Sequence, residues 1–131
     1  MIAYDIRHVP PAAVVQVMIA SVVHEHRRAR VSALLDTGSD VTAIPRTLVE
    51  RLQLYPISHL EIEGLAAITT SVFSYAVQLS VAGLVISRLE VVLTGLDFVV
   101  LGRDVLNHLY VLLNGPELTF ELATTAFVAG A

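Results

Sequence analysis

The segment Leu34–Asp40 holds the residues best suited to chemistry, because an aspartate, a threonine and a glycine directly follow two leucines. The negative charge of Asp36 at the end of an apolar strand is costly unless something binds it. Gly38, two residues later, lets the backbone turn sharply and approach a partner closely. The pattern predicts an acid held in a dry, tight loop.

A carboxylate pair is the chemistry that such a loop would support. One buried aspartate serves poorly as both general acid and general base, whereas two carboxylates about 3 Å apart share one proton and divide the roles. The chain has five aspartates, and only Asp36 stands in an Asp-Thr-Gly or Asp-Ser-Gly setting. The second carboxylate must therefore come from another copy of the chain, across a two-fold axis through the site.

The composition agrees with such self-association. Of the 131 residues, 55% are apolar and only 15% are charged, so the surface should be unusually apolar or covered by another subunit. The net charge of −4 gives no indication of binding to nucleic acid or to an acidic membrane surface. The absence of cysteine excludes disulfides and thiolate metal sites.

These features predict one domain over residues 1–131, with a core at about 13–122 and less certain ends at 1–12 and 123–131. The best candidate for a membrane span, 9–23, is too short and contains two prolines. We therefore expect a soluble, cytoplasmic protein.

Short apolar stretches separated by turn residues predict a mainly β fold that closes into a compact barrel. A capping box at Thr47–Glu50 predicts the start of a helix of about two turns. A second short helix is expected around Val105, Leu106 and Leu109. The strands are expected at 13–23, 29–35, 41–44, 60–63, 68–81, 84–93, 98–102, 110–113 and 117–122.

Two segments resemble a known family. Leu34–Thr42 looks like the active-site signature of the retropepsin-like aspartic proteases, and Val99–Leu106 resembles the family's second signature, which precedes its C-terminal helix. The predicted hairpin between them stands where the family carries its flap. The resemblance covers about Ala13 to Leu122 and is greatest to single-domain bacterial members with a Gly-Arg-Asp-Val-Leu segment.

The resemblance implies a closed, barrel-like retropepsin fold with a flap hairpin, and an aspartic endopeptidase without metal or cofactor. Water held between the two Asp36 carboxylates of a homodimer would hydrolyse an extended peptide. Thr37 would hydrogen-bond the opposite loop across the dimer axis, and Gly38 would contact the substrate backbone. The implied substrate-binding residues are Ser39, Asp40, Gly64, Leu65, Ala66, Ala67 and Ile68. The hydroxyl of Ser39 is also expected to reach the active acid.

The resemblance also implies a structural ion pair between Asp40 and Arg103, and the chemistry of the two residues agrees with it. An acid beside an active carboxylate should be neutralised, and arginine offers a two-pronged donor to a carboxylate. The pair would tie the Asp36 loop to the C-terminal helix.

Other interpretations stay open. The hairpin tip has a single glycine, Gly64, which permits a catalytically silent module for dimerisation or peptide binding, or an inactive monomer awaiting a partner. His24 and His26 flank only one carboxylate, so they make a weak case for a metal site. The arginines at 27, 28 and 30 are read as a solvated hairpin tip.

Overall fold

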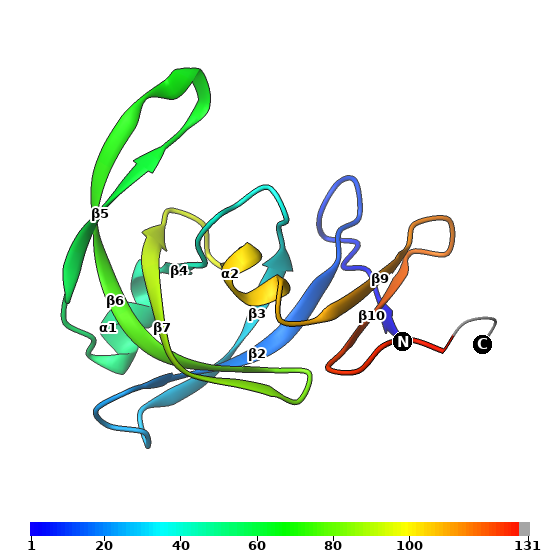
Figure 1. Cartoon of the computed structure of the whole chain (residues 1–131), viewed down its shortest axis with the longest axis horizontal. Coiled ribbons are helices and arrows are strands. Elements are labelled where there is room, and N and C mark those ends of the chain that lie inside the picture. Colours follow the sequence, from blue (N-terminus) through cyan, green and yellow to red (C-terminus); the bar gives the residue numbers. More distant parts are fainter. Residues whose placement is uncertain (129–131) are drawn as a thin grey trace.

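The computed structural model describes residues 1–128, and Figure 1 shows its strands and short helices. The strands are β1 (Ile2–Ala3), β2 (Val14–Ser21), β3 (Arg28–Leu35), β4 (Ala43–Pro45), β5 (Ser58–Glu63), β6 (Thr69–Val81), β7 (Leu84–Thr94), β8 (Val99–Leu101), β9 (Tyr110–Asn114) and β10 (Thr119–Ala123). The helices are α1 (Arg46–Leu52), α2 (Arg103–Leu106) and a 3-10 turn, η1 (Leu65–Ala67). The described helices include none that is long and apolar enough to cross a bilayer.

The main sheet closes into a barrel. Its strand order is β2-β3-β8-β4-β7-β6-β5, and β6 also pairs with β2, so six strands form a ring while β5 stays outside it. The predicted hairpin of β2 and β3 is present, with Val14 opposite Leu34 and Ala20 opposite Arg28. The expectation of a mainly β, barrel-like fold with two short helices is confirmed.

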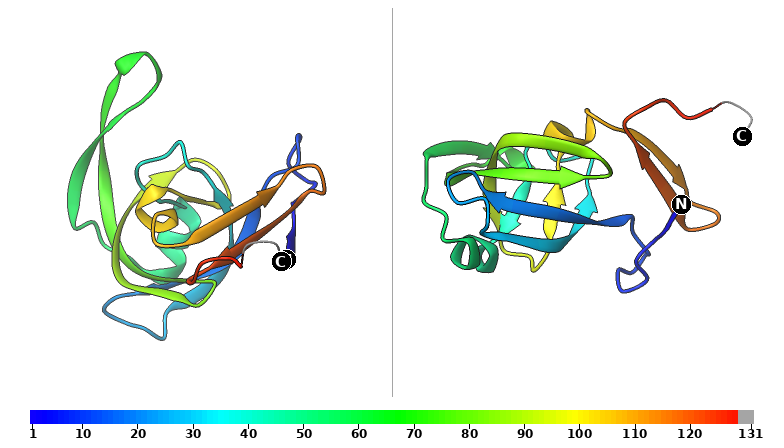
Figure 2. Two further views of the ribbon diagram at one scale, coloured as in Figure 1. Left: turned by 45° about the vertical axis from the view of Figure 1, so that its right-hand side comes forward. Right: turned by 90° about the horizontal axis from the view of Figure 1, so that it is seen from below.

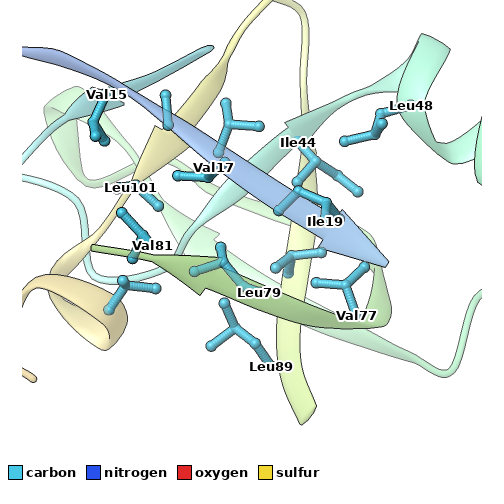
Figure 3. Packing of buried hydrophobic residues seen from close by; sticks show 14 of the residues in the cluster. Val15, Val17, Ile19, Ile44, Leu48, Val77, Leu79, Val81, Leu89 and Leu101 are labelled. Atoms are coloured by element: carbon cyan, nitrogen blue, oxygen red, sulfur yellow. The ribbon is translucent and has the colours of Figure 1, made fainter. Parts of the chain in front are cut away.

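The barrel interior is filled by alternating apolar residues, as a sheet with one buried face requires. On β2, Val15, Val17 and Ile19 are buried while Gln16 between them is exposed. Figure 3 shows side chains of β2 and β6 packed together in this core. Burying each leucine, isoleucine or valine side chain stabilises the fold by about 1.5–3 kcal/mol relative to leaving it exposed. This cluster therefore stabilises the barrel from which the loops extend.

The β5–β6 hairpin projects beyond the barrel (Figure 1 and the left panel of Figure 2). Its pairs run from Ser58 opposite Ser74 to Glu63 opposite Thr69. The η1 turn forms its tip, and the N–H of Gly64 donates to the carbonyl of Ile68 at 2.9 Å. The predicted hairpin is therefore present, with a compact tip.

A second sheet of three strands, in the order β1-β10-β9, stands beside the barrel at the end away from α1 (Figures 1 and 2). Ile2 pairs with Phe120, whose side chain is buried. The sequence predicted no element within residues 1–12, so β1 is an addition. Residues 129–131 of the expected tail lie outside the described part of the chain.

The start of α1 differs from the prediction. The helix begins at Arg46 with Pro45 at its N-cap, and no side chain caps it, so the capping box at Thr47–Glu50 is wrong. Pro45 is buried and pairs with Thr94 as the last residue of β4, so the chain passes directly from strand to helix. The predicted apolar face of α1 is correct, because Leu48 and Leu52 are buried.

Candidate active site

Strand β3 carries Asp36 to the edge of the barrel and is held on both sides. It runs parallel to β8, with Leu35 opposite Leu101, and the N–H of Asp36 donates to the carbonyl of Leu101 at 3.0 Å. On the other side, the N–H of Leu35 donates to the carbonyl of Ala13 at 3.1 Å. The backbone of Asp36 is therefore fixed by buried strands.

The loop after β3 folds back on the Asp36 carboxylate. Asp36 Oδ1 accepts a hydrogen bond from the N–H of Gly38 at 2.9 Å. A Cβ atom at Gly38 would lie 3.1 Å from the same oxygen, a tight approach that glycine avoids. The hydroxyl of Ser39 donates to the carbonyl of Val41 at 2.7 Å, so the expected bond from this hydroxyl to the active acid is wrong. Ser39 shapes the loop instead.

The loop is open to solvent in the single chain. Asp36 is half-buried, whereas Thr37 and Gly38 are exposed. The prediction of a dry loop is therefore wrong for one chain by itself, since no described segment of the same chain covers these residues.

Arg103, the first residue of α2, braces the loop through three contacts. Its N–H donates to the carbonyl of Ser39 at 2.8 Å, and its Nη1 donates to the carbonyl of Thr37 at 2.6 Å. Its Nη2 forms an ion pair with Asp40 Oδ1. The Asp40 side chain is 85% exposed, so solvent screens the pair and it adds little stability by itself. Its role is to orient the loop.

The sequence motifs indicated no role for two further residues of this site, Thr42 and Asp104. Asp104 accepts hydrogen bonds from the N–H of Thr42 at 2.9 Å and from its hydroxyl at 2.7 Å. The Thr42 hydroxyl also accepts from the N–H of Gly102 at 3.1 Å. The signal for them was an acid directly after Arg103 and a polar residue at the entrance to a buried strand. Together they fasten the end of the loop to α2.

A groove of about 890 Å³ separates the Asp36 loop from the β5–β6 hairpin. Leu60 and Ile62 on β5 pair with Val72 and Thr70 on β6, and these four residues share one face of the hairpin. All four line the groove, and further apolar residues in its walls are Val41, Ala43, Val92, Leu93 and Val100. The groove therefore has apolar walls together with three acidic residues, Asp40, Glu61 and Glu63, along its lining.

The structure distributes the predicted site residues unevenly around this groove. Ser39, Asp40, Gly64 and Ile68 line it together with Gly38. Asp36 and Thr37 stand beside the groove and are not part of its lining. Ala66 and Ala67 are exposed at the hairpin tip and do not line it either. The side chain of Leu65 lies outside the described part of the structure.

His24 and His26 lie on the exposed connection between β2 and β3. The rings of His24 and His26 are 5.8 Å apart. Within residues 1–128, no group of three or more histidine, aspartate or glutamate side chains is arranged to hold a metal ion.

Comparisons with known proteins give consistent results. A family model described as aspartyl protease matches residues 15–117. The fold resembles that of EIAV protease in complex with the inhibitor HBY-793, with a TM-score of 0.54 and 23% identity over 73% of this chain and 86% of that chain. It also resembles the simian foamy virus (mac) protease in solution, with a TM-score of 0.51 and 18% identity over 70% and 89% of the two chains. A search of curated proteins found no significant match.

Proposed function

The chain belongs to the aspartyl protease family, and on that premise we propose that it is an aspartic endopeptidase that acts as a homodimer. The observation that carries the proposal is the setting of Asp36. Its backbone is held by buried strands, its carboxylate accepts a hydrogen bond from the Gly38 N–H, and its loop lies beside a groove with apolar walls. Such an acid is fixed in position yet accessible to substrate.

The need for a second chain follows from the other carboxylates nearby. Asp40 is paired with Arg103, and both oxygens of Asp104 accept hydrogen bonds from Thr42. Neither acid is free to share a proton with Asp36. The second carboxylate of the proposed site is therefore Asp36 of the partner subunit, which would also cover the exposed loop.

In the proposed mechanism, a water molecule lies between the two Asp36 carboxylates, one ionised and one protonated. The ionised carboxylate takes a proton from the water, and the water oxygen attacks the peptide carbonyl carbon. The protonated carboxyl donates its proton to the carbonyl oxygen. When the tetrahedral intermediate collapses, the C–N bond breaks and the amine nitrogen receives a proton. The acid pair of aspartic proteases is the established example of this shared-proton chemistry.

The groove supports an extended peptide as substrate. An extended chain would lie between the Asp36 loop and the β5–β6 hairpin, with the hairpin acting as a flap and alternate side chains entering the apolar walls. Ser39, Asp40, Gly64 and Ile68 are the proposed groove contacts, and the tip residues Leu65, Ala66 and Ala67 would reach the substrate when the flap closes.

Thr37 is proposed as the contact between the two active loops, and Gly38 as a contact for the substrate backbone. Arg103 holds the Thr37 carbonyl, while Thr37 itself remains exposed. Its hydroxyl is therefore available to the opposite loop across the two-fold axis, where it would keep the two Asp36 carboxylates in register.

The test is the Asp36→Asn variant against a matched control, Asp97→Asn, which changes an exposed aspartate outside the groove. Asparagine keeps an oxygen acceptor for the Gly38 N–H but neither takes nor gives the proton. We expect Asp36→Asn to fold and dimerise yet lose cleavage in a peptide-library digest read by mass spectrometry, while Asp97→Asn cleaves like the parent. Equal cleavage by Asp36→Asn contradicts the mechanism. A dimeric parent that cleaves nothing at any pH supports the silent peptide-binding module instead.

A further inference from the structure

We propose that Ser74 and Glu90 are positioning residues, which hold the β5–β6 hairpin in place above the groove. The hydroxyl of Ser74 donates a hydrogen bond to Oε2 of Glu90 at 2.5 Å. Neither residue lines the groove, so the pair would act on a substrate only through the hairpin. The inference rests on the proposed function, in which this hairpin closes over a peptide, and it names two residues that determine how firmly the peptide is held.

Ser74 is the residue at which β6 changes its neighbours. It lies opposite Ser58 of β5, in the pair farthest from the hairpin tip, and opposite Val92 of β7. Residues 69–73 of β6 pair with β5 alone within the described part of the chain, whereas the residues that follow Ser74 pair with β7. Figure 1 shows β6 continuing from the barrel into the projecting hairpin. A bond made by Ser74 therefore acts at the base of the hairpin.

The Ser74 hydroxyl depends on Glu90 as its acceptor. Ser74 is completely buried, whereas Glu90 is exposed. Burying a hydroxyl group costs free energy unless it forms a hydrogen bond, and the Glu90 carboxylate supplies that bond. Hydrogen bonds to a carboxylate belong to the stronger, charge-assisted class. The base of the hairpin is therefore held by more than its backbone ladder.

The hydrogen bond crosses diagonally from β6 to β7. Ser74 lies opposite Val92, and Glu90 lies opposite Ala76, so the two bonded residues are not directly opposite each other. Diagonal neighbours in an antiparallel pair are about 7–8 Å apart, within reach of a long side chain such as glutamate. Turning the hairpin away from β7, or sliding it along β7, would break this bond. The pair therefore restrains both movements.

Strand β7 is itself attached to the residues that hold the Asp36 loop. The N–H of Val92 donates to the carbonyl of Thr42 at 3.1 Å, and Thr42 is bonded to Asp104 of α2. Val92 also lines the groove, as does Val72 on the hairpin. The bond at the hairpin base therefore fixes the hairpin wall of the groove relative to the wall that carries the active loop.

The first test compares Ser74→Ala with Ser80→Ala, which removes a half-buried hydroxyl farther along the same strand. The N–H of Ile57 donates to the Ser74 carbonyl at 2.8 Å, so its hydrogen exchange reports on the hairpin base. We expect the Ile57 amide to exchange about tenfold faster in Ser74→Ala than in the parent, and at the parental rate in Ser80→Ala. Equal exchange in Ser74→Ala and the parent would overturn the proposal.

The second test separates the hydrogen bond from the packing of Ser74. Glu90→Ala should accelerate Ile57 exchange more than Ser74→Ala does, because it leaves a buried hydroxyl without its acceptor. Adding Ser74→Ala to Glu90→Ala should then bring the rate back toward that of Ser74→Ala alone. Glu25→Ala, at the exposed β2–β3 turn, is the control and should change nothing. If the effects of Ser74→Ala and Glu90→Ala instead multiply in the double variant, the two residues act independently and the proposal is wrong.

The third test measures peptide cleavage. Ser74→Ala should raise KM by about fivefold or more while kcat stays within about twofold of the parent, because the Asp36 loop keeps its alignment while the hairpin holds the peptide less firmly. Ser80→Ala should change neither constant. A fall in kcat without a change in KM would contradict the positioning role. If the parent cleaves nothing but Ile57 exchange responds as expected, the Ser74–Glu90 bond still places the hairpin and only the protease is refuted. Cleavage by a parent whose Ile57 exchange is insensitive to Ser74→Ala would refute the positioning role alone.

Discussion

Both carboxylate oxygens of Asp104 accept hydrogen bonds from Thr42, one from the backbone N–H at 2.9 Å and one from the hydroxyl at 2.7 Å. The two residues are 62 positions apart in the sequence. The Thr42 hydroxyl also accepts a hydrogen bond from the N–H of Gly102, which lies between β8 and α2. Thr42 therefore connects the end of the Asp36 loop to β8 and α2.

Thr42→Val should destabilise the fold by about 2 kcal/mol or more, because it keeps the side-chain shape but leaves the Gly102 N–H and an Asp104 oxygen without their partner. Thr42 is fully buried, so water is poorly placed to replace the lost bonds. The measurement is urea unfolding. Thr42→Ser keeps the hydroxyl and serves as the control. If Thr42→Val is as stable as Thr42→Ser, the hydrogen bonds of the Thr42 hydroxyl contribute nothing to the free energy of unfolding.

Gly102→Ala should be among the most damaging small substitutions. An added Cβ would lie 2.7 Å from the carbonyl carbon of Val41 and 2.9 Å from the carbonyl oxygen of Ser39, both backbone atoms. Overpacking of this kind costs about 1–3 kcal/mol. Gly95→Ala is the matched control, because nothing lies within 4 Å of the added atom. Thermal unfolding should separate the two variants clearly, and equal melting temperatures would contradict the prediction.

Arg103→Lys should reduce turnover far more than stability. A lysine ammonium reaches either the Thr37 carbonyl or Asp40, whereas the guanidinium holds both. If the proposed function is correct, the loop that carries Asp36 loses its alignment, and kcat should fall by about tenfold or more with a smaller change in KM. Arg46→Lys, at an exposed position of α1, is the control. A loss confined to KM would argue against a positioning role for Arg103.

The N-terminal turn should show a distinctive acid response. The side-chain hydrogen bond from Arg7 to Asp5, at 2.6 Å, is the main cause that lowers the pKa of Asp5 from 3.8 to about 2. Because the folded-state pKa is lowered, the stabilisation is complete above the unfolded value of 3.8 and is lost as the pH falls through about 2. In Arg7→Gln, the midpoint of the Asp5 carboxyl titration, followed by NMR, should move back toward 3.8. An unchanged midpoint would exclude Arg7 as the cause.

The strands and the two signatures could be predicted because their signals are local. Val15, Val17 and Ile19 alternate with polar or half-buried neighbours, and the Asp-Thr-Gly segment ends a strand in the sequence as it does in the structure. The ion pair of Arg103 with Asp40 was implied by the family resemblance, and it agrees with the need to neutralise an acid beside the active carboxylate.

Other features depend on residues distant in the chain. The pairing of Ile2 with Phe120 has no local signal, because a two-residue strand forms only against a strand that is already present. Thr47 met the sequence rule for a helix cap, but Pro45 ends β4 inside the sheet and takes that position. The Ser39 hydroxyl turned to the Val41 carbonyl because the loop closes on itself.

The attachment of the β5–β6 hairpin to the barrel has a consequence for how the molecule fluctuates. Within residues 1–128, β5 pairs with β6 alone, and the hairpin above Ser74 is a two-stranded ribbon whose residues are mostly exposed. Two-stranded ribbons are only marginally stable in water, whereas opening the barrel requires exposure of its core. Amide protection should therefore fall in a step along β6, from slow exchange at residues 75–81 to fast exchange at 69–73. The β5–β6 hairpin can then open away from the groove many times for each time that the barrel unfolds.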